Sequence, residues 1–250
     1  MDLDHVALAT ADVTDALDFF VGRLGGTILF GGQGPGFRPM TLRIGDAHEG
    51  MNVELLEPWD THRSDFLARF LERDGEGPHH LTFKVPDLRA TLERVGDAGL
   101  HPVNVDLSNP AWMEAFLHPR EVQGTVVQLA QAADIFGDRA ELLAHVADHG
   151  PRGNPAWWPP APPAGPRASM RRVVIGTPSL PETRSLYTGL LEGEEIESGE
   201  GWVELAWPGG ARVRLESRGG APGVDRLEYR QPGSRREDLI AGTRLVAVVD

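Results

Sequence analysis

Cysteine is absent from this chain of 250 residues, which excludes a disulfide framework and thiolate chemistry. Long apolar runs are absent too, because no segment approaches the roughly 20 apolar residues that span a bilayer. The N-terminus lacks the basic and apolar regions of a signal peptide. From these absences we expect a cytoplasmic protein that has no membrane as a partner.

Positive charge is scarce. The chain has 24 lysine and arginine residues against 37 aspartate and glutamate residues, a net charge of −13, and Lys84 is its only lysine. Nucleic-acid binding needs a basic face to meet the phosphates, so we expect no nucleic-acid partner. An anionic substrate would need a local cluster of arginines, because the overall field repels it.

An internal repeat organises the N-terminal half. A short apolar run with a histidine at its head, His5, occurs near the start, and a second such run begins at His80. An aspartate follows each histidine after seven residues, Asp12 and Asp87, where it is suited to cap a helix. An apolar helical stripe and three strand-like segments follow in both copies. Each copy therefore predicts the order strand, helix, strand, strand, strand.

The later segments of each copy have these predicted bounds. The strands of the first copy are expected at 26–30, 38–44 and 51–56, and those of the second at 101–106, 112–118 and 122–130. A short connecting helix is expected over 64–73, because its apolar residues recur at helical spacing before a glycine-rich stop.

The C-terminal half contains a weaker third copy. It begins at residue 170 with Arg172 in place of the histidine, and strands are expected at 201–207 and 211–216. A fragment of a fourth copy follows at 226–229 and 245–248, with its helix and intervening strands predicted to be missing.

A linker separates the two halves. A helix is expected over 133–146, and residues 150–169 then carry seven prolines around Trp157 and Trp158, a composition typical of an extended, semi-rigid segment. We expect the two tryptophans to pack on the protein's own surface. The predicted domains are therefore 1–132, with two modules, 133–169, the helix and linker, and 170–250, a truncated copy.

Residues 1–131 resemble the vicinal oxygen chelate superfamily, which includes glyoxalase I, methylmalonyl-CoA epimerase, extradiol dioxygenases and bleomycin resistance proteins. The similarity is greatest to methylmalonyl-CoA epimerase, and the matching pieces, in order along the chain, are residues 4–7, 53–58, 70–80, 116–119 and 124–129. The resemblance implies an α+β fold in which paired βαβββ modules form a half-barrel, plus a degenerate C-terminal partial copy. It also implies a homodimer, unless the extra copy covers the same edge within one chain.

The resemblance implies a metal site as well. In the family, each module places one ligand on its first strand and one on its last, which here are His5 with Glu54 and His80 with Gln128. The offsets agree, because Glu54 follows His5 by 49 residues and Gln128 follows His80 by 48. Two imidazoles, a carboxylate and an amide oxygen suit one divalent ion of Zn, Co, Ni, Mn or Fe.

Two neighbouring histidines compete for one ligand position. Only His80 precedes its helix-capping aspartate by seven residues, as His5 does. Side chains alternate along a strand, so His79 is expected to face the other way.

The C-terminal copy has no metal ligands at the equivalent positions. The positions of His5, Glu54 and His80 are occupied by Arg172, Arg214 and Arg226, and the position of Gln128 is occupied by Val246. The arginines would either line an anion pocket or serve a structural role, and we expect the structural role.

The expected function is that of a metal-dependent enzyme of the glyoxalase or epimerase type acting on an oxygenated small molecule. A divalent ion would stabilise an enolate, in isomerase, lyase or cyclase chemistry. Glu54 is the candidate catalytic carboxylate, because Gln128 is neutral and the loop at 31–36 contains no acid. Two alternatives stay open: a metal-free small-molecule or antibiotic-binding protein of the resistance type, and an Fe(II) dioxygenase.

Overall fold

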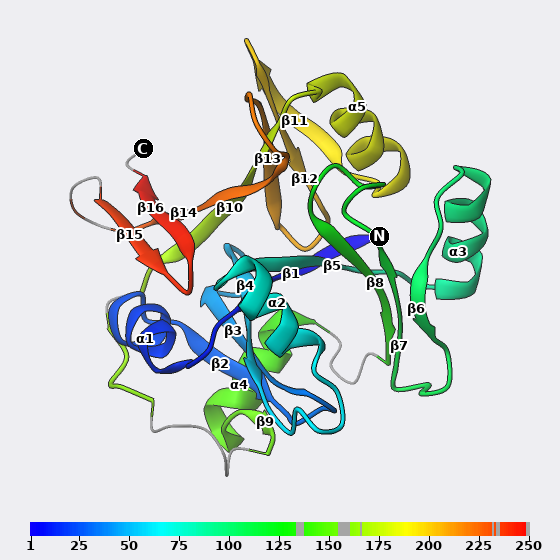
Figure 1. The fold of residues 1–250 in the computed structure, drawn as a ribbon. Coiled ribbons are helices and arrows are strands. Elements are labelled where there is room, and N and C mark those ends of the chain that lie inside the picture. Colours follow the sequence, from blue (N-terminus) through cyan, green and yellow to red (C-terminus); the bar gives the residue numbers. More distant parts are fainter. Residues whose placement is uncertain (134–137, 155–160, 166, 232, 234–235, 249–250) are drawn as a thin grey trace. The chain divides into compact units, whose positions relative to one another are not determined.

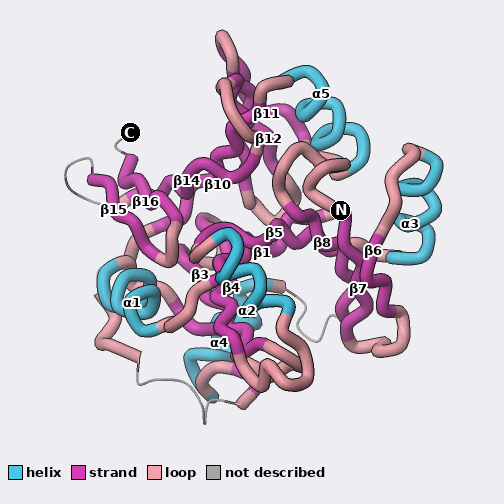
Figure 2. Tube along the Cα trace, viewed as in Figure 1, coloured by secondary structure: helices cyan, strands magenta, loops and turns pink. Residues whose placement is uncertain are grey.

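The computed structural model describes residues 1–133, 138–154, 161–165, 167–231, 233 and 236–248. Trp157 and Trp158, predicted to anchor the linker, lie outside these residues. Figure 1 shows the order of the elements along the chain, and Figure 2 shows that the chain contains both helices and strands. The predicted α+β class is confirmed.

The first two modules have the predicted order of elements. The first consists of β1 (Asp2–Ala9), α1 (Thr14–Leu17) continued by the π-helical turn η1 (Asp18–Arg23), β2 (Thr27–Gly31), β3 (Phe37–Gly45) and β4 (Gly50–Pro58). The second consists of β5 (Gly77–Lys84), α3 (Leu88–Asp97), β6 (Val103–Asp106), β7 (Trp112–Leu117) and β8 (Val126–Ala132). The expected cap at Asp87 forms, because its side chain accepts a hydrogen bond from the Ala90 amide.

The remaining elements connect the modules or build the C-terminal copies. Helix α2 (Phe66–Asp74) joins the first two modules, and α4 (Arg139–His149) and β9 (Arg152–Gly153) follow the second. The third copy consists of β10 (Ser169–Thr177), α5 (Leu180–Ser185) with η3 (Leu186–Leu190), β11 (Glu194–Gly199), β12 (Trp202–Ala206) and β13 (Arg212–Ser217). The last copy consists of β14 (Gly223–Arg230), β15 (Arg236–Ile240) and β16 (Thr243–Val248).

The strands form two sheets. Sheet A has the order β6-β7-β8-β5-β1-β4-β3-β2-β9, and sheet B has the order β11-β12-β13-β10-β14-β16-β15. In every copy the first strand is hydrogen-bonded to the last, as β5 is to β8 in parallel. The repeat positions on first and last strands are therefore brought side by side by the sheet itself.

The chain divides into two compact units, each of which draws on both halves of the sequence. One comprises Met1–His5, His80–Ile135 and Arg172–Arg226, and within it the ring of Phe83 meets that of Trp207 edge to face at 5.4 Å. The other comprises Val6–His79, Phe136–Arg171 and Leu227–Asp250, and within it Arg23 pairs with Asp238 at 2.5 Å. The domain boundaries proposed from the sequence stay a prediction.

Several elements differ from the expectation, and two of them are edge strands of sheet B. The segment between β14 and β16, expected to lack strands, contains β15, and β11 was also missed. Both are end strands of sheet B with mostly exposed residues, so neither shows the apolar alternation of a half-buried strand. Strand β8 begins later than predicted, because Gln123 and Gly124 have positive φ and turn the chain. Helix α4 begins at Arg139, where the Asp138 side chain caps it.

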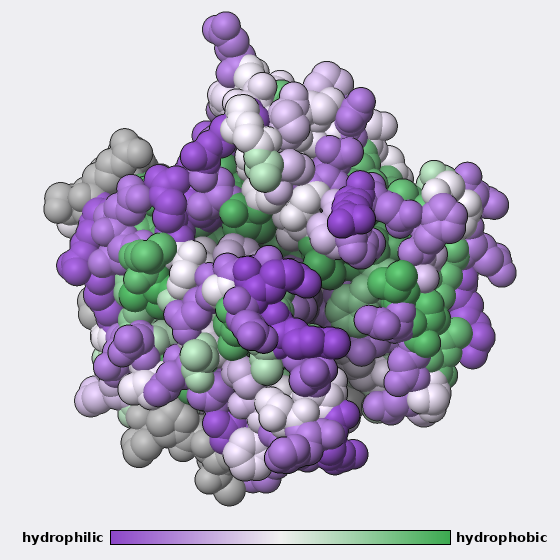
Figure 3. All heavy atoms as spheres, viewed as in Figure 1, coloured by the Kyte–Doolittle hydropathy of each residue, from purple (hydrophilic) through white to green (hydrophobic). Residues whose placement is uncertain are grey.

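The surface over part of sheet A is apolar. Figure 3 shows hydrophobic residues gathered over β6–β8 on the visible face, and Val103 and Val105 of the edge strand β6 are exposed. In the part of the chain that the structure describes, the helices are too short or too polar to cross a membrane.

Candidate metal centre

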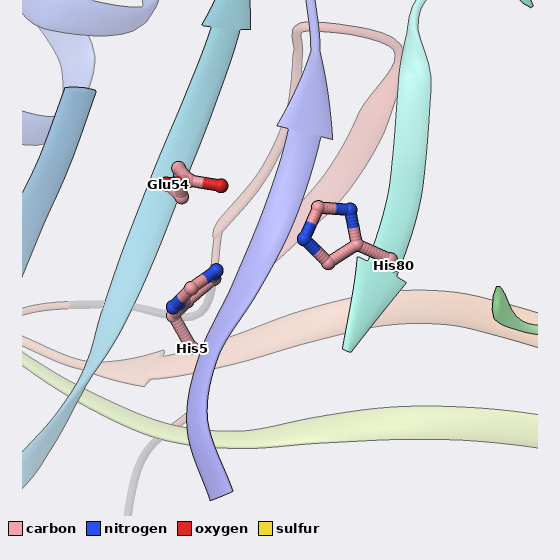
Figure 4. A group of neighbouring side chains, drawn as sticks. All are labelled: His5, Glu54 and His80. Atoms are coloured by element: carbon pink, nitrogen blue, oxygen red, sulfur yellow. The ribbon is translucent and has the colours of Figure 1, made fainter. Parts of the chain in front are cut away.

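Three of the four predicted ligands meet in the structure. His5 of β1, Glu54 of β4 and His80 of β5 each offer one ligand atom, and these atoms all lie within 4.8 Å of one another. Figure 4 shows the three side chains on neighbouring strands, turned toward one another. Both histidines are buried, Glu54 is half-buried, and the two imidazole rings meet edge to face at 5.7 Å.

The donor set fits a divalent transition metal. Bonds of about 2.0–2.2 Å to nitrogen and oxygen place two ligand atoms of one ion roughly 3–4 Å apart, so small side-chain rotations would suffice here. Imidazole and carboxylate together suit Zn, Fe, Co, Ni or Mn better than Ca, which prefers oxygen alone. The group formed by His5, Glu54 and His80 could therefore hold one such ion, whose identity the donor set leaves open.

Gln128, the fourth predicted ligand, is buried on β8 and has polar partners on both sides. It lies opposite Thr82, two residues along β5 from His80, and its Oε1 accepts a hydrogen bond of 2.5 Å from the Thr82 hydroxyl. The same hydroxyl lies 2.8 Å from Nε2 of His5. Thr82 thus links Gln128 to His5, and the direct ligand role of Gln128 stays a prediction.

A second carboxylate, Glu114 on β7, belongs to the same network. Its Oε2 accepts hydrogen bonds from Nε2 of Gln128 at 2.6 Å and from Nε1 of Trp112 at 2.7 Å. Phe116 pairs with Gln128 across the strands, so Glu114, two residues earlier, shares the face of Gln128. Close polar contacts therefore connect His5, Thr82, Gln128 and Glu114 in this order.

Sequence reasoning missed Thr82 and Glu114. The alternation of side chains could have found Thr82, because it stands two residues after His80 and so faces the same side. Glu114 needed the register of β7 against β8, which depends on the turn between them.

His79 is placed apart from the three candidate ligands. Its ring packs edge to face on Phe66 and Phe70 of α2, with centroids 6.1 and 4.7 Å away. These phenylalanines border a cluster of buried residues, which consists of Ala7, Ala9, Leu56 and Leu67. Burial lowers the pKa of His79 to about 4, although the charge of Glu54 acts in the opposite direction. At neutral pH His79 is therefore an uncharged packing residue.

The titration of His79 predicts a pH dependence of stability. The unfolded chain takes up a proton near pH 6.5 but the folded chain only near pH 4, so protonation favours unfolding between these values. The stabilisation is complete above pH 6.5 and is lost as pH falls toward 4, by about 3 kcal/mol at most. We expect His79→Phe to remove this part of the pH dependence in urea unfolding of the metal-free chain.

A matched histidine provides the control for that measurement. His62 is exposed, and His62→Phe, measured in the same way, controls for the loss of an imidazole from the surface. Identical slopes for the parent chain and His79→Phe between pH 4 and 6.5 would contradict the assignment of His79 as a buried neutral residue.

The equivalent positions of the C-terminal copy form an ion-pair network. Arg214 of β13 donates two hydrogen bonds to Oε2 of Glu204, at 3.1 and 2.8 Å, and Arg172 of β10 donates to the same oxygen. Arg212 approaches Oε1 at 3.4 Å, and the Glu204 side chain is only 1% exposed. Arg226 pairs with other carboxylates, the nearest being Glu216 at 2.7 Å. Guanidinium groups thus occupy the face where the N-terminal copy carries its candidate ligands, and the contacts favour the structural role.

Comparisons with known proteins agree with the geometry of the N-terminal half. Residues 4–115 match the family model described as the Glyoxalase/Bleomycin resistance protein/Dioxygenase superfamily. The chain is 27% identical over 132 residues to an uncharacterised protein, YqjC, of Bacillus subtilis, which covers 52% of this chain and 91% of that protein. It is also 27% identical over 133 residues to an ethylmalonyl-CoA/methylmalonyl-CoA epimerase of Cereibacter sphaeroides, covering 52% and 96%.

A solved structure extends the fold comparison to the whole chain. A hypothetical protein from Staphylococcus aureus superposes with a TM-score of 0.62 over 99% of this chain and 98% of that one, at 11% identity. At this identity the likeness concerns the fold alone, and it covers the C-terminal copies as well as the first two modules. The N-terminal half belongs to the glyoxalase/bleomycin resistance protein/dioxygenase superfamily and has distant similarity to methylmalonyl-CoA epimerase.

Proposed function

We propose that the chain is a divalent-metal-dependent enzyme that removes a proton next to a carbonyl group of an oxygenated small molecule, in an isomerase, lyase or cyclase reaction. The observation that carries the proposal is the meeting of His5, Glu54 and His80 on adjacent strands. The epimerase activity in the name of the Cereibacter sphaeroides relative supports this reaction class. The substrate is proposed only as a small molecule, because the fold hosts several chemistries.

The bound ion and the protein residues have separate roles in this proposal. A divalent ion, when bound, acts as a Lewis acid that makes a proton alpha to a carbonyl group easier to remove. His5, Glu54 and His80 would hold it. Burial of both histidines keeps water from competing for the site.

The proton needs an acceptor that is not itself neutralised by the ion. Glu54 is the candidate catalytic carboxylate from the sequence, but a carboxylate that holds a cation is a weaker base than one beside it. We therefore include Glu114 in the proposal as the proton acceptor. The N–H groups of Gln128 and Trp112 bond to its Oε2 and so fix its orientation on this face of the sheet.

Two histidines and one carboxylate are also the ligand set of non-haem Fe(II) oxygenases. This likeness supports the oxygenase as a second candidate. It would bind iron selectively and consume oxygen in the presence of a catechol, whereas proton abstraction next to a carbonyl group consumes none.

The central experiment measures metal content and proton exchange together. Elemental analysis of the purified chain, before and after titration with Zn, Co, Ni, Mn and Fe(II), is expected to give one ion per chain. The loaded protein is then incubated in D2O with a panel of 2-oxo acids and acyl thioesters, and deuterium at the alpha carbon is followed by NMR.

The outcomes separate the three functional classes. Exchange that a chelator stops and added metal restores supports the proposed enzyme. Oxygen uptake with a catechol and iron supports the oxygenase instead. A chain that neither contains nor takes up a divalent metal is neither enzyme, and the metal-free binding protein then becomes the better hypothesis.

Glu114→Gln is expected to slow this exchange without releasing the ion. Loss of a positioned general base costs about 10²–10⁴-fold in rate, while His5, Glu54 and His80 are unchanged. The measurement compares the exchange rate with the metal content of the same sample. Glu121→Gln, which alters a half-buried carboxylate bonded to His101, is the matched control and should exchange at the parent rate. Full exchange by Glu114→Gln would remove Glu114 from the proposal.

A further inference from the structure

We infer that Asp4 and Lys84 form a positioning pair that holds the imidazole of His5 in the orientation for metal binding. The inference rests on the proposed function only in that it requires the site of His5, Glu54 and His80 to bind a metal. It assigns a role to the only lysine of the chain, which nothing in the repeat pattern singles out.

The geometry of the pair is a short hydrogen-bonded chain. Oδ2 of Asp4 lies 2.8 Å from Nδ1 of His5, and Oδ1 of Asp4 lies 2.8 Å from Nζ of Lys84. Each carboxylate oxygen of Asp4 therefore has its own partner. Asp4 precedes His5 on β1, and Lys84 ends β5, the neighbouring strand of sheet A.

The exposure of the three side chains falls step by step toward the metal site. Lys84 is 39% exposed, Asp4 19% and His5 4%. A carboxylate with so little access to water depends on its protein partners for the stability of its charge. Lys84 reaches Asp4 from the solvent side and supplies that charge partner.

The carboxylate fixes which ring nitrogen of His5 faces the metal site. A hydrogen bond from Nδ1–H to a carboxylate keeps the proton on Nδ1 and leaves the lone pair of Nε2 for an ion, and it raises the basicity of that nitrogen. Nε2 is the other nitrogen of the ring, and it lies 2.8 Å from the hydroxyl of Thr82, which donates its proton to Gln128. The Asp4 contact and the predicted ligand set thus require the same tautomer.

Lys84→Met is the variant that tests the pair. It removes the ammonium group that pairs with Oδ1 of Asp4. The methionine side chain replaces the apolar stem of the lysine at similar length. We expect the dissociation constant for Zn or Co to rise about 10-fold, and about 10–100-fold for Asp4→Asn, the range for partners of metal-binding histidines. Lys84→Arg, which restores the charge, should return the constant to within about 3-fold of the parent value.

Two further measurements separate positioning from a general structural effect. The metal-free variants are expected to lose part of the free energy of unfolding, because Asp4 has little access to water, so urea unfolding is used to show that each variant is folded under the binding conditions. The visible spectrum of the Co-loaded protein should change in Asp4→Asn because the histidine ligand turns. Arg94→Met is the matched control, since Arg94 is an exposed cation paired with Glu192 and not with Asp4. It should bind metal as the parent does.

The outcomes distinguish this inference from the proposed function. A parent chain that binds metal, with Lys84→Met and Asp4→Asn binding equally well, would overturn the positioning pair and leave the proposed enzyme intact. An equal loss in Arg94→Met would also overturn it, because the effect would then be one of overall charge. A parent chain that binds no metal would overturn both.

Discussion

The His5→Ala/His80→Ala double variant is expected to lose stoichiometric metal binding. It leaves Glu54 as the remaining member of the group that the structure brings together. Protein sites of four ligands bind Zn²⁺ with roughly 10–16 kcal/mol, so the removal of two ligands should weaken binding by about 10³-fold or more. Equilibrium dialysis against Zn or Co, followed by elemental analysis, measures the change directly.

Other histidines of the chain provide the control for this double variant. His101 is 83% exposed and bonds to Glu121, so His101→Ala removes an imidazole without touching the site. It should keep one ion per chain. A double variant that also retains one ion per chain would show that His5 and His80 are not the ligands.

The sequence alone was sufficient to predict the two histidines that the structure brings together with Glu54, and the reason is the repeat. The equal distances from His5 to Asp12 and from His80 to Asp87 identify equivalent strands and choose His80 over His79. The structure places His79 on the phenylalanines of α2, where the alternation of side chains predicted a different environment from that of His80. Wherever one face of a strand is buried, the alternation of side chains is fixed and can be predicted from the sequence.

The contacts among the neighbours of the candidate ligands could not be predicted in the same way, because these contacts depend on the register between strands. Thr82 meets Gln128 since these residues are opposite each other in β5 and β8, and Glu114 joins them through the pairing of β7 with β8. The contact of Lys84 with Asp4 joins residues 80 positions apart. None of these pairs has a signature in the local sequence, so the network around the site emerges only from the fold.

Edge strands show a second limit of the sequence. Strand β15 was not predicted, because exposure of both faces removes the apolar alternation that identifies a strand. Its Leu239 is 70% exposed, which is a pattern more typical of a loop. The central strands of both sheets, with one or two buried faces, were located to within a few residues.

Glu204→Gln is expected to lower the free energy of unfolding of the chain by about 3 kcal/mol. Three guanidinium groups converge on this buried carboxylate, and Arg172 and Arg214 have only 13% and 19% of their side chains exposed. Removing one partner of a buried ion pair leaves the other charges uncompensated, which costs about 3–5 kcal/mol. Urea unfolding at neutral pH measures the loss, and the midpoint should fall with little change in slope.

The acid limb of the stability curve tests the same assignment. Burial raises the pKa of Glu204, but the hydrogen bonds and charges of Arg214 and Arg172 outweigh burial and lower it below its ordinary 4.5. The ionised carboxylate therefore stabilises the fold above pH 4.5, and this contribution is lost as pH falls through the lowered folded value. The Glu204→Gln variant should lack that part of the acid dependence.

Glu216→Gln is the control that shows whether the expected loss of stability is specific to the buried carboxylate of Glu204. Glu216 pairs with Arg226 at 2.7 Å, but 29% of its side chain is exposed, so water replaces much of what the substitution removes. Its cost should be about 1 kcal/mol or less. If the two glutamine variants unfold at the same urea concentration, Glu204 is not the centre of a buried network, and the arginines around it are available to a bound anion instead.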